Sequence, residues 1–286
     1  MRVFITGSDI GQLYWELTRT APSTVSLCQP SEMLDITDRD AVLRMVKALA
    51  PDVILNAAAY TAVDKAESDT ATAQAVNADG VRYLAEAAVE NGAHLVHVST
   101  DFVFGSGSGT PFVETADVAP VSVYGKTKLE AEEVLAQLMP DSSVVIRTAW
   151  VYSSHGNNFV KTMLRLMNER DELGVIADQI GSPTWACSLA EALWRAADIH
   201  ATGMLHWTGA GVASWYDFAV AIFEEATALG LLDREVSIKP LRTDQYPTPA
   251  ARPAYSVLEL TRSWETLGMS AIHWREDLRS MLRELT

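Results

Sequence analysis

The sequence predicts an α/β fold, with a doubly wound parallel sheet and a smaller, α-rich C-terminal portion. Short runs rich in β-branched residues alternate with amphipathic stretches in the first half of the chain, which is typical of β-α-β units. Turn signals such as Ala50-Pro51 and Asn91-Gly92 close these units. Beyond residue 153 helical patterns dominate, so the character of the chain changes there.

The predicted elements follow in order along the chain. Strands are expected at 2–6, 23–27, 52–58, 94–100 and 143–148, where apolar runs are short. Helices are expected at 11–19, 39–49, 70–91 with an interruption near Asn77, and 122–138. Right-handed crossovers place the five strands in one sheet. Further helices are predicted at 159–170, 188–199, 214–232 and 274–285. We therefore expect one domain over 1–153, to which segments around 180–212 return, and a second portion over 154–286.

Composition narrows the class of protein. The 286 residues carry a net charge of −15, which disfavours nucleic acid as a partner because phosphate backbones are repelled. The two cysteines, Cys28 and Cys187, form no pattern typical of disulfide frameworks or zinc sites. The chain begins directly with a predicted strand, and no apolar run reaches membrane-spanning length. A cytoplasmic enzyme without a membrane partner is the expectation.

Gly7 and Gly11 follow the first strand and open the first helix. Such a loop lets backbone amides approach a pyrophosphate at the positive end of the helix, as in Rossmann-type dinucleotide sites. Leu13 or Tyr14 stands where a third glycine is usual, and this bulk should move the helix outward or shift its start by one residue. A glycine-containing turn without a ligand is the rival interpretation.

The region after the second strand bears on the choice of cofactor. Leu27-Cys28-Gln29-Pro30 offers no carboxylate for an adenosine ribose, so a 2′-phosphate is not repelled and NADPH should be tolerated. An arginine that would select this phosphate is also missing, which leaves NADH and NADPH both open. Asp35 and Ile36 could lie under the adenine, while Thr37 or Asp38 could equally begin a helix as its N-cap.

Tyr124 and Lys128 lie four residues apart on a predicted helix and so share one face. A nearby ammonium favours the ionised phenol and brings its pKa closer to neutrality. Alone, such a pair more often lies on a solvated face. Thr100 and Asp101 end the fourth strand, where a hydroxyl can donate to a substrate carbonyl, although these residue types are also common in turns.

Together these features resemble the extended short-chain dehydrogenase/reductase superfamily, and within it the dTDP-4-dehydrorhamnose reductase family. The resemblance runs nearly end to end, through NAAAYTAVDKAESD (56–69), STDFVFG (99–105), VYGKTKLEAE (123–132), RTAWVY (147–152), GNNFVKTMLRL (156–166), DQIGSPT (178–184) and YPTPAARP (246–253). It implies hydride transfer from NADPH or NADH to the C4 ketone of dTDP-4-dehydro-L-rhamnose, a small nucleotide sugar. It also implies an NAD(P)-binding domain over 1–153 and a mainly substrate-binding portion over 154–286.

The resemblance implies a role for each matching residue. Tyr124 would protonate the C4 alkoxide, Lys128 would lower the pKa of this tyrosine and hold the nicotinamide ribose, and Thr100 would hydrogen-bond the ketone. Cofactor contacts are expected from Gly7, Asp9, Ile10, Gly11, Gln12, Leu13, Asp35, Ile36, Ala57, Ala58, Ala59, Tyr60, Ser99, Tyr124 and Lys128. Substrate contacts are expected from Thr100, Asp101, Phe102, Trp150, Asn157, Asn158 and Arg252, the last as a bidentate clamp on the diphosphate.

Two other interpretations stay open at this point. Related reductases act on other nucleotide-linked 4-keto-6-deoxy sugars, and the contacts that distinguish epimers lie in loops. A non-catalytic, nucleotide-binding regulatory subunit, resembling the methionine adenosyltransferase β subunit, is the second, because the glycine loop is altered. Some relatives pair through acidic side chains and a divalent metal; Glu16 and Glu284 are available, but no full ligand set is evident. We expect no metal site, and a homodimer remains open.

Overall fold

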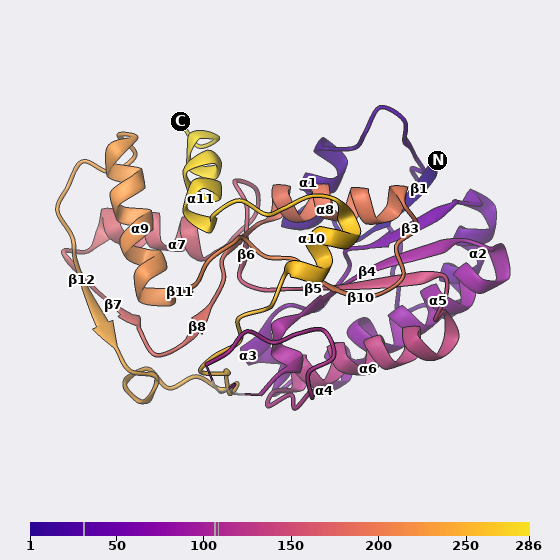
Figure 1. Ribbon diagram of the computed structural model, residues 1–286, viewed down its shortest axis with the longest axis horizontal. Helices are drawn as coiled ribbons and strands as arrows, with labels where there is room; N and C mark the ends of the chain where they lie inside the picture. Colours follow the sequence, from indigo (N-terminus) through magenta and orange to yellow (C-terminus); the bar gives the residue numbers. More distant parts are fainter. Residues whose placement is uncertain (31, 106, 108) are drawn as a thin grey trace.

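The computed structural model describes residues 1–30, 32–105, 107 and 109–286. Within them a six-stranded parallel sheet has the order β10-β5-β4-β3-β1-β2. Its strands are β1 (Arg2–Thr6), β2 (Ser26–Leu27), β3 (Val53–Asn56), β4 (His94–Thr100), β5 (Ser143–Thr148) and β10 (Gly203–His206). The predicted doubly wound α/β class is confirmed (Figure 1).

Helices cover both faces of this sheet because the side chains of each strand alternate between two apolar cores. One core holds Phe4, Ile54 and Leu95 and packs against the first group of helices, and the other holds Val3, Val53 and Val96 and packs against the second. The first group comprises α2 (Arg39–Leu49), α5 (Gly80–Asn91) and α6 (Val123–Leu138). The second comprises α1 (Gln12–Arg19), α8 (Ala186–Asp198) and α10 (Thr261–Leu267).

The sheet differs from the prediction at three places. The strand expected at 23–27 is only Ser26–Leu27, because the Val25 N–H donates to the Pro22 carbonyl at 2.9 Å and closes a turn. The strand expected at 52–58 ends at Asn56, whose side chain accepts the Ala58 N–H at 3.1 Å. A sixth strand, β10, pairs with β5 and comes from the half of the chain in which helices were expected to dominate.

The interruption expected near Asn77 is confirmed. The helical stretch is divided into α4 (Thr70–Gln74), the π-helical turn η1 (Ala75–Asp79) and α5. The Asn77 side chain reaches across this turn, where its Oδ1 accepts the Tyr60 N–H and its Nδ2 donates to the Thr127 hydroxyl. This amide therefore fastens the turn to α6, and such single-turn widenings are frequent near functional sites.

The C-terminal half adds a further apolar core. Helices α7 (Phe159–Glu169), α9 (Trp215–Ala228) and α11 (Trp274–Arg283) surround it, at the left of Figure 1. Short strand pairs complete this half: β6 (Val151–Tyr152) with β9 (Thr184–Trp185), β7 (Glu172–Ile176) with β12 (Ser237–Leu241), and β8 (Ile180–Gly181) with β11 (Ala213–Ser214). Three single turns remain, α3 (Val63–Ala66), η2 (Asp101–Val103) and η3 (Thr243–Gln245).

A buried ion pair fixes α6 to the sheet. The Arg147 guanidinium on β5 donates to both carboxylate oxygens of Glu132 on α6, at 3.0 and 2.6 Å, and lies over the Phe104 ring. Ser99 on β4 donates to the same carboxylate. A bidentate ion pair of this kind is rigid. It therefore fixes the position of α6 relative to β4 and β5.

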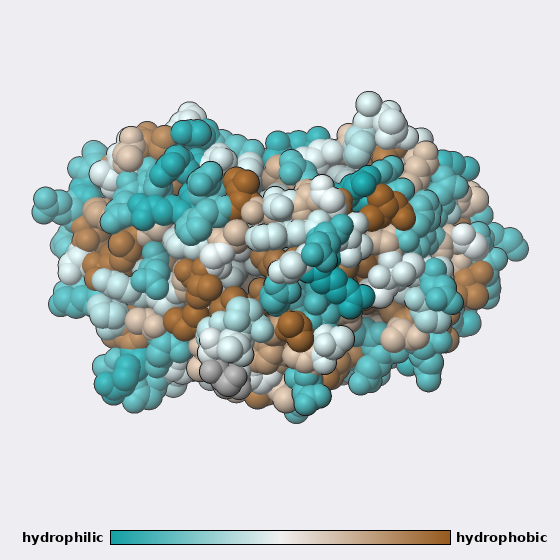
Figure 2. Space-filling view, viewed as in Figure 1, coloured by the Kyte–Doolittle hydropathy of each residue, from teal (hydrophilic) through white to brown (hydrophobic). Residues whose placement is uncertain are grey.

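The strand order reverses at β1, which has β2 on one side and β3 on the other. In open parallel sheets such a point opens a crevice beyond the carboxyl ends of the strands. The described residues contain no helix with the length and apolarity needed to cross a membrane. On the face drawn in Figure 2, hydrophobic residues are interspersed with hydrophilic ones.

Candidate active site

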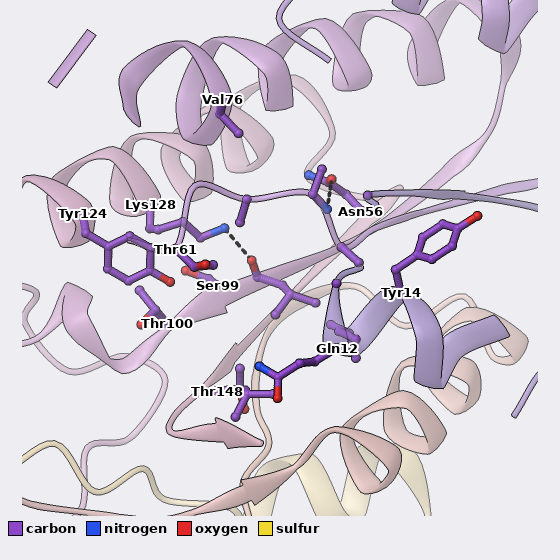
Figure 3. Close-up of a pocket in the computed structure, with 18 of the residues that line it drawn as sticks. Gln12, Tyr14, Asn56, Thr61, Val76, Ser99, Thr100, Tyr124, Lys128 and Thr148 are labelled. Atoms are coloured by element: carbon purple, nitrogen blue, oxygen red, sulfur yellow. Dashed lines mark hydrogen bonds between the residues drawn. The ribbon is translucent and has the colours of Figure 1, made fainter. Parts of the chain in front are cut away.

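A cavity of about 860 Å³ lies at the carboxyl ends of β1, β3, β4 and β5. This volume is within the range of pockets that hold small ligands. The loops after these four strands line it, together with the first turns of α1 and α6 and residues of the C-terminal half. Figure 3 shows side chains from these elements directed into the space. The expected cofactor and substrate residues that line it are Gly7, Ile10, Gly11, Gln12, Leu13, Asp35, Ile36, Ala57, Ala58, Ala59, Ser99, Thr100, Asp101, Phe102, Tyr124, Lys128, Trp150, Asn157, Asn158 and Arg252.

The glycine loop presents bare backbone to this cavity. Gly7 has a φ of 132°, a backbone conformation that residues other than glycine rarely adopt. Helix α1 begins at Gln12, and its N-cap, Gly11, supplies no side-chain hydrogen bond. No acidic residue occupies the first turn. Its N–H groups thus lack side-chain partners and can bind an anion at the positive helix end.

Tyr14 does not fill the crevice although it replaces a glycine. Its ring packs against the core beside β1, and a Cβ added to Gly7 would lie 3.4 Å from the Tyr14 Cδ2. In Figure 3 its hydroxyl points away from Tyr124 and Lys128. The ring therefore forms part of the wall, and the helix accommodates it by beginning immediately after Gly11.

The stretch at 34–38 contains the expected helix N-cap, and the adenine contact expected of it stays a prediction. Asp38 is the N-cap of α2, since its side chain accepts the Ala41 N–H at 3.0 Å. Asp35 and Ile36 line the cavity. Gly80 lets Ile36 lie close, because a Cβ there would come within 2.8 Å of the Ile36 side chain.

Two of the expected cofactor residues do not line the cavity. Asp9 is exposed, and its carbonyl contacts the His155 ring at 2.9 Å. Tyr60 uses its hydroxyl to donate to the Asp69 carboxylate at 3.1 Å, and burial is the main cause that raises the pKa of this phenol. The side chain of Tyr60 is therefore engaged elsewhere, and both residues stay predictions as cofactor contacts.

The turn at Thr100 and Asp101 packs closely against the first turn of α6. The Thr100 hydroxyl donates to Asp101 at 3.1 Å, and Ser256 donates to the other carboxylate oxygen at 2.6 Å. Burial raises the pKa of Asp101 to about 6, against the effect of these two hydroxyls. Gly125 makes the approach possible, because a Cβ there would collide with the Phe102 carbonyl oxygen. The glycine that follows Tyr124 thus brings this tyrosine next to Thr100.

Tyr124 faces the cavity from the first turn of α6. Its ring meets Phe102 edge to face, with centroids 5.7 Å apart. Burial raises the pKa of Tyr124 to about 12; a hydrogen bond with Thr100 acts in the opposite direction, and the Asp101 carboxylate adds to the rise. The phenol is therefore protonated near neutrality, as a proton donor must be.

Lys128 lies one turn further along α6, with 2% of its surface exposed. Its Nζ donates to the Val98 carbonyl at 2.6 Å and contacts the His97 ring at 3.1 Å (Figure 3). Burial lowers the pKa of Lys128 to about 8, while the Glu132 carboxylate counteracts this shift. Both side chains line the cavity, as expected for residues that share one face of the helix, and the amine is engaged with β4.

A stacked tryptophan pair lines the cavity where the C-terminal half contributes to it. The rings of Trp150 and Trp215 are nearly parallel, with centroids 3.6 Å apart. Trp150 has a φ of 48°, and Gly181 lies so close to its ring that a Cβ would come within 2.8 Å. Trp150 joins β5 to β6 and Trp215 begins α9, and both rings pack against the core of the C-terminal half.

Two of the remaining expected substrate residues, Asn158 and Arg252, already have structural partners. Asn158 caps α7 and donates to Gln12 at 2.9 Å, whereas Asn157 is exposed. Arg252, the expected diphosphate clamp, instead holds Asp64 with two bonds of 3.0 and 2.8 Å. The same hydrogen bonds are the main cause that lowers the pKa of Asp64. Arg252 and Lys128 are the two cationic side chains among the described residues that line the cavity.

Glu16 and Glu284 are joined by Arg19. Its guanidinium contacts Glu16 at 2.6 Å and Glu284 at 3.2 Å, and Glu16 is fully buried. In the described parts of the chain no cluster of three or more His, Cys, Asp or Glu side chains is arranged to bind a metal ion.

Sequence reasoning missed several residues of the cavity. Asn56, Thr61, Val76, Thr148 and Trp215 line it. Asn56 carried a usable signal, since a polar residue at the carboxyl end of a fully buried strand requires a partner. Thr61, Val76 and Trp215 come from loops and helices whose position depends on the folded chain.

Comparison with known proteins identifies the family. The family model described as RmlD substrate binding domain matches residues 1–286. A dTDP-4-dehydrorhamnose reductase of Aggregatibacter actinomycetemcomitans is 44% identical over 254 residues, which cover 87% of this chain and 86% of the relative. The chain belongs to the dTDP-4-dehydrorhamnose reductase family. It is thereby a member of a family of NAD(P)H-dependent oxidoreductases, and the regulatory-subunit interpretation gives way to an enzyme.

Solved structures agree with this assignment. The dTDP-4-dehydrorhamnose reductase of Clostridium acetobutylicum has 40% sequence identity and a TM-score of 0.92, with 100% of this chain and 99% of that chain covered. The enzyme of Bacillus anthracis, in complex with NADP, has 35% identity and a TM-score of 0.91, with 99% of each chain covered. The family resemblance read from the motifs is therefore confirmed.

If Tyr14 is a wall residue and not an obstruction, its removal should cost stability. We expect Tyr14→Gly to lower the free energy of unfolding by about 2–4 kcal/mol, through lost packing and a helical glycine. Tyr14→Phe, the matched control, should change it by less than about 0.5 kcal/mol because it keeps the ring. Urea unfolding measures both variants, and an unchanged stability of Tyr14→Gly would contradict the packing role.

The buried Asp101 carboxyl should make stability depend on pH in a defined window. Its folded pKa of about 6 exceeds the ordinary value of 3.8, so the folded state binds this proton more tightly. The protonated carboxyl therefore contributes to the free energy of unfolding. This contribution is complete below pH 3.8 and is lost as pH rises through about 6, a total change of about 3 kcal/mol. Relative to Asp101→Asn, the parent should lose about 2.4 kcal/mol of unfolding free energy from pH 4 to pH 7. A difference independent of pH would contradict it.

Proposed function

We propose that this protein reduces the C4 ketone of dTDP-4-dehydro-L-rhamnose to dTDP-L-rhamnose with NADPH or NADH. The observation that carries the proposal is that Thr100, Tyr124 and Lys128 line one cavity with the glycine loop. The family supports the reaction class, since its members are named for this reduction. The arrangement supplies an anion-binding loop, a protonated phenol and a hydroxyl within a single cavity.

The crevice fits a nicotinamide dinucleotide. The N–H groups of the first turn of α1, unopposed by acidic side chains, suit a pyrophosphate. Gly7 permits close approach of the backbone to a ligand. The small side chains of Ala57, Ala58 and Ala59 leave space in the cavity after β3. The NADP complex of the Bacillus anthracis relative supports the same cofactor class here. When bound, the reduced nicotinamide supplies the hydride.

The side chains of this protein would guide the proton and the substrate. On turning away from Asp101, the Thr100 hydroxyl would donate its one hydrogen bond to the ketone oxygen and stabilise the negative charge that develops there. Tyr124, protonated near neutrality, would transfer its phenolic proton to that oxygen. Lys128 would hold the nicotinamide ribose and, once charged, lower the pKa of Tyr124, so that the phenol becomes a stronger acid.

The two halves of the chain would divide the work. Residues 1–153 would bind the cofactor, and 154–286 would mainly bind the nucleotide sugar. The stacked rings of Trp150 and Trp215 offer an apolar surface at the sugar end of the cavity. Arg252 would contact the diphosphate only if its bonds to Asp64 were shared or released.

A second candidate is the reduction of another nucleotide-linked 4-keto-6-deoxy sugar. Several walls at the sugar end come from loops, such as the two segments that bear Asn157 and Arg252, and these would set which epimer fits. Phe102 supports this alternative, because it places an apolar ring at the cavity wall where a tyrosine would offer a hydroxyl.

A substrate panel tests the function. We expect purified protein to oxidise NADPH, followed at 340 nm, when dTDP-4-dehydrorhamnose is added and not with cofactor alone. Other dTDP- and UDP-linked 4-ketohexoses, each assayed with NADH and NADPH, form the comparison set. Faster turnover of another sugar would replace the substrate assignment, and the absence of turnover throughout the panel would refute the reductase.

The proton donor is tested by Tyr124→Phe. We expect a loss of turnover of about 100-fold or more, the usual contribution of a positioned general acid, with NADPH affinity kept within about two-fold. Tyr83→Phe on α5, which lies outside the cavity lining, is the matched control and should retain full turnover. Steady-state rates and calorimetric titration with NADPH provide the readouts. Undiminished turnover of Tyr124→Phe would refute the acid assignment.

A further inference from the structure

Three polar side chains lie side by side under the cavity, one on each of three neighbouring strands. Thr6 on β1 is paired in register with Asn56 on β3, and Asn56 is paired with His97 on β4. All three are buried, with exposures of 2%, 2% and 0%. They face the side of the sheet that α6 covers, and they form one connected chain of hydrogen bonds that ends at Lys128.

The backbone fixes how the Asn56 amide is oriented. Its Oδ1 accepts the Ala58 N–H at 3.1 Å and the Thr6 hydroxyl at 2.6 Å. A backbone N–H can only donate, so the atom that faces Ala58 must be the amide oxygen. The amide nitrogen, which can only donate, is therefore turned toward His97, and its Nδ2 lies 3.0 Å from the His97 Nδ1.

This orientation selects one tautomer of His97. Because Asn56 donates to Nδ1, that nitrogen must carry a lone pair, and the proton of the neutral ring is on Nε2. An imidazolium would direct a second N–H at the Asn56 donor. Burial, the main cause, and the nearby Lys128 keep the pKa of His97 well below its usual value, in agreement with a neutral ring.

The tautomer in turn determines the charge on Lys128. The Nε2–H of His97 is directed at the Lys128 Nζ, 3.1 Å away, and donates to it. An ammonium has three donors and no lone pair, so it cannot accept this bond, whereas a neutral amine can. The neutral amine still has an N–H for the Val98 carbonyl at 2.6 Å.

We propose that His97 is a positioning residue, which holds the uncharged form of Lys128 against β4, so that the charged form has to turn toward the cavity. Protonation of Lys128 then requires the amine to leave the His97 Nε2–H and turn toward the cavity. In one step, the Lys128 amine thereby becomes charged and becomes available to Tyr124 and the ribose. The inference rests on the reductase proposed above for the role of Lys128, but the tautomer itself does not depend on that role.

The other ionisable groups around Lys128 leave this account intact. Tyr124 and Glu132 lie on the same helix, His97 approaches from β4, Arg147 from β5, and Asp101 from the turn η2. Arg147 pairs with Glu132 through both oxygens, which reduces the attraction of this carboxylate for a charged Lys128. The pKa of Lys128, lowered to about 8 by burial, agrees with a readily lost proton.

The proposal is tested by NMR of the full chain labelled with 15N-histidine. Two-bond proton–nitrogen correlations distinguish the Nε2–H from the Nδ1–H tautomer, and loss of one of the six histidine patterns in His97→Gln assigns the signal. At pH 9 without cofactor we expect His97 as the Nε2–H tautomer. The opposite tautomer, or an imidazolium, would overturn the proposal. The spectrum requires no substrate, so its failure is distinct from a failure of the substrate panel.

Two variants test the cause. Asn56→Asp replaces the donor toward His97 with an acceptor, so His97 should change to the Nδ1–H tautomer and the pKa of Lys128 should rise by about one unit or more. Thr6→Val is the matched control, because Ala58 still orients Asn56, and His97 should keep the Nε2–H tautomer. An unchanged tautomer in Asn56→Asp, or a changed one in Thr6→Val, would show that Asn56 does not set the ring. If His97→Gln does not fold, the response of one signal to Asn56→Asp assigns His97.

Discussion

Lys128 has a single amine enclosed between helix α6 and the carboxyl end of β4, and the candidate site depends on how that amine is solvated. With 2% of its surface exposed, the side chain relies on the Val98 carbonyl and His97 in place of water. Burial therefore lowers the pKa of Lys128 to about 8, which puts its charge within reach of small changes in the surroundings. A ligand in the crevice would be such a change.

The parallel sheet produces this situation because register and strand parity bring selected residues together. Thr6, Asn56 and His97 occupy matching positions on β1, β3 and β4, so their side chains meet on the face beneath α6. The same strands end at the cavity and present Gly7, Ala57 and Thr100 to it. The same strand pairing therefore has two consequences: it brings the buried polar side chains together beneath α6, and it places the loops after these strands at the cavity. The Glu132–Arg147 pair fixes α6 at the height at which both sets of contacts are possible.

The sequence predicted most of the frame, because strand and helix signals here are local. The parallel class, the break near Asn77 and most helix limits follow from periodicity and turn residues. The sequence did not predict contacts between distant segments. Neither the bonds of Arg252 to Asp64 nor the partnership of Lys128 with His97 has a local signal, since their sequence separations are 188 and 31 residues. The polar residue ending the buried strand β3 was the one usable clue.

The measurement that tests this account most directly is the pKa of Lys128 with and without NADPH, followed by the chemical shift of its 13Cε carbon. The account predicts a value of about 8 in the free protein and a higher value in the complex, because the amine leaves His97 for acceptors on the ligand and Tyr124. An ordinary lysine pKa of about 10.4 in the free protein, or a value that NADPH leaves unchanged, would contradict it.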